Sequence, residues 1–315
     1  MELKLNTIYP GDCLEQLKEL PDELVQCCVT SPPYWRLRDY GIAGQLGSED
    51  TPEDYVQALT AIFREVRRVL KPDGTLWLNL GDAYWGSGKA GKNPGYQARH
   101  TEFGKPSRDT ARFGRPTTGK HPEIKNKDLI GLPWMVAFAL RKQGWYLRQD
   151  IIWHKPSHMP ESVTDRCTKA HEYIFLFSKS PKYYFDHTAI KTPAKGKSIY
   201  DRTSRMARKA PENKLINCFR KERGPYDTAN RRSVWSMITV PFKGAHSAAF
   251  PPELPELCIK AGSRESDIIL DPFMGAGTTA LAAASLNRQY IGFELNPEYI
   301  AVAEKRISDQ LQADN

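Results

Sequence analysis

The segment that most restricts the fold lies near the C-terminal end, where a short apolar run is followed by an acid and a glycine-rich turn. Residues 268–270 precede Asp271-Pro272-Phe273-Met274-Gly275-Ala276-Gly277-Thr278-Thr279 and the alanine-rich run 280–284. We interpret this order as a buried strand, a turn and a helix, because glycines let backbone approach a ligand and threonines cap helix starts. A second strand, residues 289–293, ends in Glu294. Two strands joined in this way indicate a nucleotide-binding α/β fold.

Two features of this segment select the kind of nucleotide. The turn has the pattern Gly-x-Gly, at Gly275 and Gly277, without the third spaced glycine that is typical of dinucleotide sites. Glu294, at the end of the second strand, is placed to bind ribose hydroxyls, and Asp271 can receive an ammonium group. A nucleoside with a charged amino-acid tail satisfies both acids. We therefore predict S-adenosylmethionine as the cofactor.

A second motif lies near the N-terminal end, where the strand-like run 25–29 is followed by Thr30-Ser31-Pro32-Pro33-Tyr34-Trp35. Two prolines hold φ near about −65° and remove two backbone donors, so the strand must end in a stiff, extended elbow. Such an elbow presents the Ser31 hydroxyl, the Pro32 carbonyl and an aromatic face at the sheet edge where α/β folds bind ligands. Hydrogen-bond acceptors beside an aromatic ring suit a planar base that carries an exocyclic amine.

The two motifs together resemble the amino methyltransferases that modify exocyclic nitrogens of DNA bases. Their order, with the proline elbow first and the glycine turn last, resembles the β class of that family. Further segments resemble family elements in the expected order, namely Gly11-Asp12 and residues 74–82, 150–156, 171–178 and 251–257. The resemblance therefore extends over nearly the whole chain.

The resemblance implies a division of roles within the site. Ser31 Oγ and the Pro32 carbonyl are expected to accept hydrogen bonds from the target amine, while Tyr34 stacks on a base extruded from the duplex. The predicted catalytic residues are Ser31, Pro32, Pro33 and Tyr34. The predicted cofactor-binding residues are Asp12, Asp271, Pro272, Phe273, Gly275, Gly277, Thr278, Glu294 and Asn296. Asp12 could instead cap a helix, and Phe273 could instead pack in the core; His171 and Glu172 are assigned no role, and no metal is expected.

The net charge of +8 is concentrated in two segments. Residues 85–127 hold ten Lys/Arg against three acids and residues 188–232 hold thirteen against four, so the rest of the chain is net acidic. A solvated surface is one explanation, but two such segments are more simply explained by contact with DNA phosphates. The predicted DNA-binding residues are Trp35, Arg38, Lys89, Lys92, Arg108, Arg112, Arg202, Arg205, Arg208 and Lys209. For Trp35, core packing is an equal alternative.

Apolar patterns along the chain alternate between strands and helices, which indicates a doubly wound, mostly parallel, Rossmann-like sheet. The resemblance implies seven strands, of which we expect residues 172–177 to run antiparallel. Residues 1–187 are expected to form the catalytic half, including the basic loop 85–127. Residues 188–232 would form an inserted target-recognition region, and residues 233–315 the cofactor-binding half. Because that half must fold beside the elbow, we predict one domain in permuted order.

The residue at position 31 indicates the target base. Members of the family tend to carry an acid or asparagine there when they act on adenine, and serine when they act on cytosine. Methylation of cytosine N4 is therefore predicted, with the same mechanism on adenine N6 as the alternative. A cytosine C5 enzyme is disfavoured, because it needs a cysteine nucleophile and no cysteine here follows a proline. An RNA or small-molecule methyltransferase is a more distant alternative, since basic segments serve RNA as well.

Composition narrows the cellular setting. Six cysteines without Cys-x-x-Cys spacing favour a reducing cytosol, and no apolar run approaches the roughly 20 residues of a membrane span. We expect a cytoplasmic, nucleoid-associated protein whose partner is double-stranded DNA and not a membrane. A cognate restriction endonuclease is a further candidate partner, and a monomer and a homodimer are both open.

Overall fold

A mixed eight-stranded sheet forms the centre of the structure, a computed structural model that describes residues 3–37, 42–86, 121–158, 161–194, 227–238 and 250–313. The strands are β1 (Thr7–Pro10), β2 (Val25–Thr30), β3 (Leu70–Leu80), β4 (Tyr146–His154), β5 (His171–Ser178), β8 (Val234–Ser236), β9 (Ile268–Asp271) and β10 (Gln289–Glu294). Their order in the sheet is β1-β10-β9-β2-β3-β5-β4-β8. Neighbouring strands are parallel except where β5 pairs antiparallel with β3 and β4.

The predicted antiparallel strand is confirmed as β5, but the predicted number of seven strands is wrong for the part of the chain that the structure describes. The additional strand is β8, which pairs in parallel with residues 152–154 of β4. Only Trp235 of its three residues is buried, between the exposed side chains of Val234 and Ser236. A strand this short shows no alternation long enough to be predicted from sequence.

The permuted order predicted from the sequence is seen directly in the sheet. β2 pairs with β3 on one side and with β9 on the other, where Cys28 lies opposite Leu270. The strand that ends in the proline elbow is therefore the neighbour of the strand that ends in Asp271. Segments from opposite ends of the chain meet at the same sheet edge.

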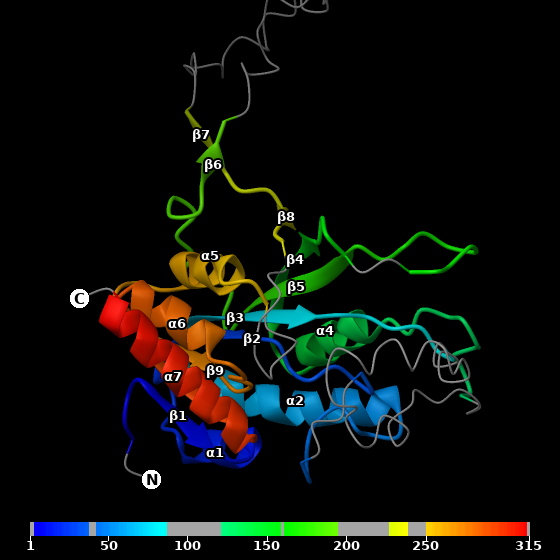
Figure 1. Cartoon of the computed structure of the whole chain (residues 1–315), viewed down its shortest axis with the longest axis horizontal. Helices are drawn as coiled ribbons and strands as arrows, with labels where there is room; N and C mark the ends of the chain where they lie inside the picture. Colours follow the sequence, from blue (N-terminus) through cyan, green and yellow to red (C-terminus); the bar gives the residue numbers. More distant parts are fainter. Residues whose placement is uncertain are drawn as a thin grey trace, which may run out of the picture. The chain divides into compact units, whose positions relative to one another are not determined.

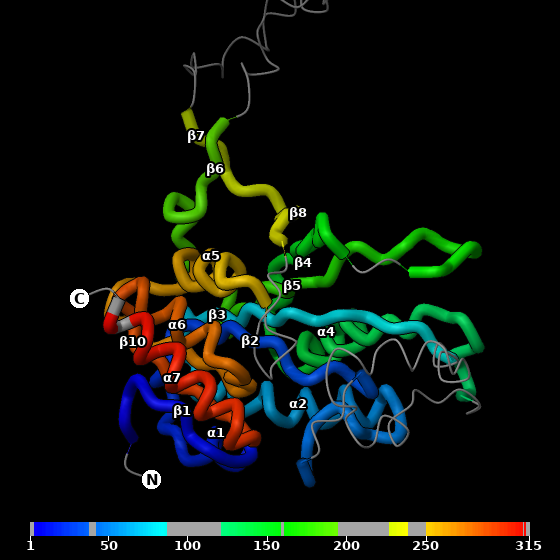
Figure 2. The backbone as a smooth tube through the Cα atoms, in the orientation of Figure 1, coloured from blue at the N-terminus to red at the C-terminus, as the bar shows by residue number. Residues whose placement is uncertain are grey.

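Helices form two groups, which Figure 1 shows on either side of the sheet and Figure 2 traces through the backbone. One group contains α1 (Cys13–Glu19), α2 (Pro52–Val69) and α4 (Leu132–Lys142), and the other contains α5 (Glu253–Gly262), α6 (Thr278–Ser285) and α7 (Pro297–Ala313). Within each group, consecutive helices contact one another. Two helical layers around a mostly parallel sheet are the doubly wound arrangement.

The longest helix, α2, illustrates how local sequence sets these elements. Thr51 caps its first turn by accepting a hydrogen bond from the Asp54 N–H, and Pro52 occupies the first helical position. Basic residues occupy the last turn, where they stabilise the helix dipole. Its apolar face, including Leu59 and Phe63, is fully buried against the sheet core.

Among the described residues, no helix combines the length and the apolar character needed to cross a membrane.

Residues Asp186–Arg232 form a separate compact unit. Its described part contains a two-stranded antiparallel ribbon, β6 (Thr192–Pro193) with β7 (Thr228–Ala229). These residues nearly coincide with the predicted insert 188–232, whose role in target recognition stays a prediction.

Candidate active site

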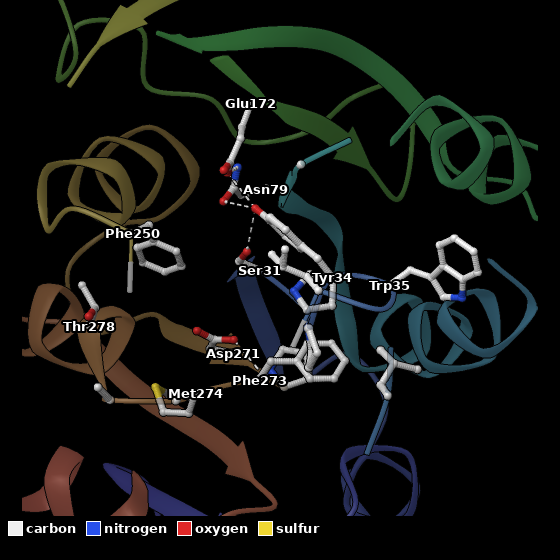
Figure 3. Close-up of a pocket in the computed structure, with 18 of the residues that line it drawn as sticks. Ser31, Tyr34, Trp35, Asn79, Glu172, Phe250, Asp271, Phe273, Met274 and Thr278 are labelled. Atoms are coloured by element: carbon white, nitrogen blue, oxygen red, sulfur yellow. Dashed lines mark hydrogen bonds between the residues drawn. The ribbon is translucent and has the colours of Figure 1, made fainter. Parts of the chain in front are cut away.

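Strand ends converge on a cavity of about 1000 Å³ at the carboxyl edge of the parallel strands (Figure 3). Its lining includes all four predicted catalytic residues, Ser31, Pro32, Pro33 and Tyr34. It also includes eight of the predicted cofactor-binding residues: Asp12, Asp271, Pro272, Phe273, Gly275, Thr278, Glu294 and Asn296. The structure thus brings both motifs into one cavity, as a reaction between a cofactor and a base requires.

Asp271 ends β9 and is held rigidly. It is only 2% exposed, and its carboxylate accepts hydrogen bonds from the hydroxyls of Thr30 and Thr279, both at 2.6 Å, and from the Phe273 N–H at 3.0 Å. Burial raises the pKa of Asp271 to about 6, against the opposing effect of the two hydroxyls. A desolvated carboxylate at a cavity wall is suited to an ammonium group.

Glu294 ends β10 and is oriented by the backbone around it. One carboxylate oxygen accepts from the Gly275 N–H and the other from the Asn296 N–H, each at 2.8 Å. Burial raises the pKa of this carboxyl as well. Each oxygen keeps a lone pair for a further donor, such as a ribose hydroxyl. An acid for a diol and an acid for an ammonium fit S-adenosylmethionine, as predicted from the sequence.

Gly277 has a packing role that the sequence analysis did not predict. It does not line the cavity, and a Cβ built on it would lie 2.8 Å from Cβ of Ala303 on α7. Its φ is +78°, in the left-handed region that favours glycine. Gly277 therefore permits a tight turn and the approach of α7, while its predicted cofactor contact stays a prediction. Of these two turn glycines, Gly275, whose N–H donates to Glu294, is the one that lines the cavity.

The elbow after β2 is fixed from both sides. The Pro33 carbonyl accepts a hydrogen bond from the hydroxyl of Tyr55, a buried residue of α2, at 2.8 Å. The Tyr34 ring lies against Gly81, where a Cβ would come within 2.6 Å of Tyr34 Cε2. Gly81 directly follows β3, so the absence of its side chain makes room for the ring.

Two polar residues that sequence reasoning left without a role, Asn79 and Glu172, contact the Tyr34 hydroxyl. The hydroxyl donates to Glu172 at 2.7 Å and lies 3.2 Å from Asn79 Oδ1. Glu172 in turn forms an ion pair with Lys155. The hydroxyl also lies 3.5 Å from Ser31 Oγ, which joins this group to the predicted acceptor. In Figure 3 the hydroxyl of Tyr34 points toward Glu172 and Asn79, whereas Trp35 points away from them.

Glu172 was missed because we expected functional residues at the carboxyl ends of strands. β5 is antiparallel, so its first residues lie at the edge where its neighbours end: Leu80 pairs with Tyr173, and His154 pairs with His171. The only signal in the sequence was an acid at the start of the one strand predicted to be reversed.

Asp12 and Trp35 each form contacts that support the structural alternative to the predicted role. Asp12 caps α1 by accepting hydrogen bonds from the N–H groups of Leu14 and Glu15. The helix-cap alternative is thus confirmed, and a cofactor contact through its second oxygen stays a prediction.

Trp35 is 2% exposed, stacks on Trp85 with 6.0 Å between the ring centroids, and donates a hydrogen bond to the Glu49 carbonyl. These contacts support the core-packing alternative for Trp35, although the residue also lines the cavity, and its DNA contact stays a prediction.

The other predicted DNA-binding residues lie outside the described part of the chain. They are Arg38, Lys89, Lys92, Arg108, Arg112, Arg202, Arg205, Arg208 and Lys209. Their roles stay predictions.

A nucleoside site and a rigid acceptor elbow on one Rossmann-like sheet define a methyltransferase. The family model for N6/N4 DNA methylases, described as DNA methylase, matches residues 25–305, and the chain belongs to this family. It is 46% identical over 308 residues to the type II methyltransferase M.XycI of Xanthomonas campestris pv. cyanopsidis, covering 98% of this chain and 89% of that protein. It is 45% identical to M.SmaI of Serratia marcescens, covering 95% and 90% of the two chains.

Solved structures agree with this assignment. A putative DNA modification methylase of Thermus thermophilus, complexed with S-adenosyl-L-methionine, is 25% identical with a TM-score of 0.57, covering 96% of this chain and 93% of that one. The PvuII DNA methyltransferase, described as cytosine-N4-specific, shares the fold with a TM-score of 0.61 at 20% identity, covering 96% and 90%. The protein is a DNA methyltransferase that uses S-adenosylmethionine.

Proposed function

We propose that the protein methylates the exocyclic N4 of a cytosine that has left the DNA duplex, at a specific site. The observation that carries the target assignment is Ser31, which follows β2 and lines the cavity beside Asp271. Serine at this position of the family motif is associated with cytosine, and an acid or asparagine with adenine. Methylation of adenine N6 by the same mechanism is the alternative, because both bases present an amine to the same acceptors.

The chain's own groups act by positioning. S-adenosylmethionine, when bound, supplies an electrophilic sulfonium methyl group, and Asp271 and Glu294 are the acids that would hold its ammonium and ribose groups. A cytosine amine is a poor nucleophile because its lone pair is delocalised into the ring. Ser31 Oγ and the Pro32 carbonyl would accept hydrogen bonds from the N–H groups of this amine. These hydrogen bonds favour a pyramidal nitrogen, whose lone pair can attack the methyl group. Holding two reactants in this geometry lowers the barrier by removing the entropy of encounter.

The test identifies the methylated nucleoside. Wild-type protein is incubated with labelled S-adenosylmethionine and duplex DNA, the DNA is digested, and the nucleosides are separated and identified by mass spectrometry. We expect N4-methylcytosine; N6-methyladenine would contradict the target assignment.

A pair of serine variants tests the site. Ser31→Ala should lower turnover while leaving cofactor affinity almost unchanged, because only an acceptor to the amine is removed. The matched control is Ser285→Ala on α6, whose hydroxyl bonds to the Ala282 carbonyl of its own helix at 3.0 Å. Equal single-turnover rates in both variants would contradict the assignment of the elbow.

The relatives named above are type II methyltransferases, which supports a companion endonuclease that cuts the same sequence. We propose such a partner, and a location in the cytoplasm beside the nucleoid, because the substrate is DNA. Measuring protection of DNA against digestion in a cell extract of the source would test the partner. Sedimentation of the purified protein would decide between monomer and homodimer.

A further inference from the structure

The Tyr34 hydroxyl lies among groups whose hydrogen-bonding direction is fixed. Glu172 is ion-paired with Lys155 and only 16% exposed at its side chain, so its carboxylate has no hydrogen to give. Asn79 Nδ2 donates to Glu172 at 3.2 Å and to the Tyr173 carbonyl at 3.1 Å. Because both partners of that nitrogen are acceptors, the amide cannot be reversed, and Asn79 Oδ1 must face Tyr34.

These constraints set the direction of the whole chain of hydrogen bonds. Tyr34 faces two acceptors, Glu172 Oε2 at 2.7 Å and Asn79 Oδ1 at 3.2 Å, so its single hydrogen is used there. Burial, and then the charge of Glu172, raise the pKa of Tyr34, which keeps the phenol protonated. The tyrosine oxygen can therefore only accept from Ser31, 3.5 Å away.

We propose that Glu172 is a positioning residue that makes Ser31 a pure acceptor toward the target base. The single hydrogen of Ser31 is drawn toward Tyr34, so the lone pairs of Oγ are left free for the N–H of the incoming amine. The same polarity disfavours a base with a carbonyl at that position, such as thymine or uracil, because two acceptors would face each other. This inference rests on the proposed function, since it assigns a role to Glu172 in the same reaction.

Glu172→Gln tests the polarity. The amide nitrogen can donate to the tyrosine oxygen but can no longer accept the tyrosine hydrogen, so Asn79 Oδ1, at 3.2 Å, is the one acceptor of this pair that still competes with Ser31 for it. The Ser31 hydrogen is then drawn less firmly toward Tyr34 and can turn toward the target. We expect the single-turnover methylation rate to fall about tenfold, the scale of one net hydrogen bond, with unchanged affinity for S-adenosylmethionine. The matched control is Glu65→Gln, a glutamate 21% exposed and paired with Arg68 on α2, which should leave the rate unchanged.

A double-mutant cycle separates this role from a merely structural one. Tyr34→Phe keeps the ring but interrupts the chain, so Glu172→Gln should add little to the loss already caused by Tyr34→Phe. Additive losses would overturn the inference, because Glu172 would then act independently of Tyr34. If the wild-type protein methylates no base, it is the proposed function that fails instead.

A second cycle covers the case in which Glu172→Gln does not fold, as judged by its melting temperature. Ser31→Ala and Tyr34→Phe each remove one hydroxyl and leave the carboxylate paired with Lys155. If Tyr34 acts by orienting Ser31, the double variant should be no slower than Ser31→Ala. A further loss in the double variant would overturn the inference.

Discussion

At Asp271, the proposed role in cofactor binding and the stability of the fold oppose each other. Its pKa in the folded protein is about 6, above the ordinary 3.8, because burial penalises the charged form. A raised carboxyl pKa means that the unfolded chain ionises first, so this group lowers the free energy of unfolding as pH rises from 3.8 through about 6. The shift corresponds to about 3 kcal/mol above that window. The fold tolerates a charge there that the cofactor's ammonium can neutralise.

Asp271→Asn should therefore stabilise the cofactor-free protein and abolish its affinity for S-adenosylmethionine. The amide can keep the Thr30 and Phe273 bonds through its oxygen and donate to Thr279, whose hydroxyl has the Val29 carbonyl 3.5 Å away. We expect a higher melting temperature than wild type at pH 8 and no gain at pH 4. Thermal melts at both pH values and calorimetry with the cofactor check this. A stabilisation that persists at pH 4 would show that charge burial is not its cause.

The missing side chain at Gly81 makes room for the Tyr34 ring. In Gly81→Ala the new methyl group would lie 2.6 Å from Tyr34 Cε2, so the ring must move. We expect methylation to slow by about 10- to 100-fold, the range caused by small misplacements at an active site, with cofactor affinity preserved. Single-turnover rates measure the effect. The control is the Tyr34→Ala background, in which Gly81→Ala should cost nothing more; an equal cost in both backgrounds would argue against the ring as the target.

At the scale of elements, strand direction decides which residues reach the cavity. The parallel strands β1, β2, β9 and β10 contribute residues at or just after their carboxyl ends, and the antiparallel β5 contributes residues at its beginning. One reversed strand is therefore enough to bring Glu172 next to an elbow that lies far away in the sequence.

Gly277 packs the glycine turn against α7, where a Cβ on it would meet Ala303. Gly277→Ala should destabilise the protein, by roughly 1–2 kcal/mol from the left-handed backbone alone, and by more from the contact with Ala303. Ala303→Gly removes the methyl group that would clash, so the destabilisation of the double variant should be smaller than the sum of the single ones. Denaturant unfolding of the four proteins measures this coupling. A loss of cofactor affinity without any loss of stability would instead place Gly277 against the ligand.

At the scale of the whole molecule, the net positive charge lies in two segments, residues 85–127 and 188–232, while the rest of the chain is net acidic. We predict that residues 85–127 bind phosphates without sequence preference and that residues 188–232 read the target site. Neutralising Lys89, Lys92, Arg108 and Arg112 should weaken binding to all sequences alike. The logarithmic dependence of affinity on salt should become shallower by about one unit of slope for each phosphate that is no longer neutralised. Titrations at several salt concentrations, with cognate and unrelated duplexes, check this.

Exchange of residues 188–232 for the same region of a related enzyme should instead change which site is methylated. Sequencing of the methylated positions gives the answer. If the exchange leaves the site unchanged while variants in residues 85–127 alter it, the two roles are reversed.

By itself the sequence determined the class of fold and the two motifs that line the cavity, because these depend on local chemistry. Prolines end β2 in an elbow, glycines shape the turn into α6, and an apolar strand with a terminal acid is recognisable without its neighbours. The predicted threonine cap is wrong, because Gly277 is the N-cap of α6 and no side chain caps that helix; the Thr279 hydroxyl bonds to Asp271 instead. Tertiary structure alone decided what each group faces. Gly277 meets Ala303 of α7, Trp35 is stacked on Trp85, and Glu172 reaches the Tyr34 hydroxyl. Such contacts join residues far apart in the chain, and they are set by strand direction and packing, which no local pattern encodes.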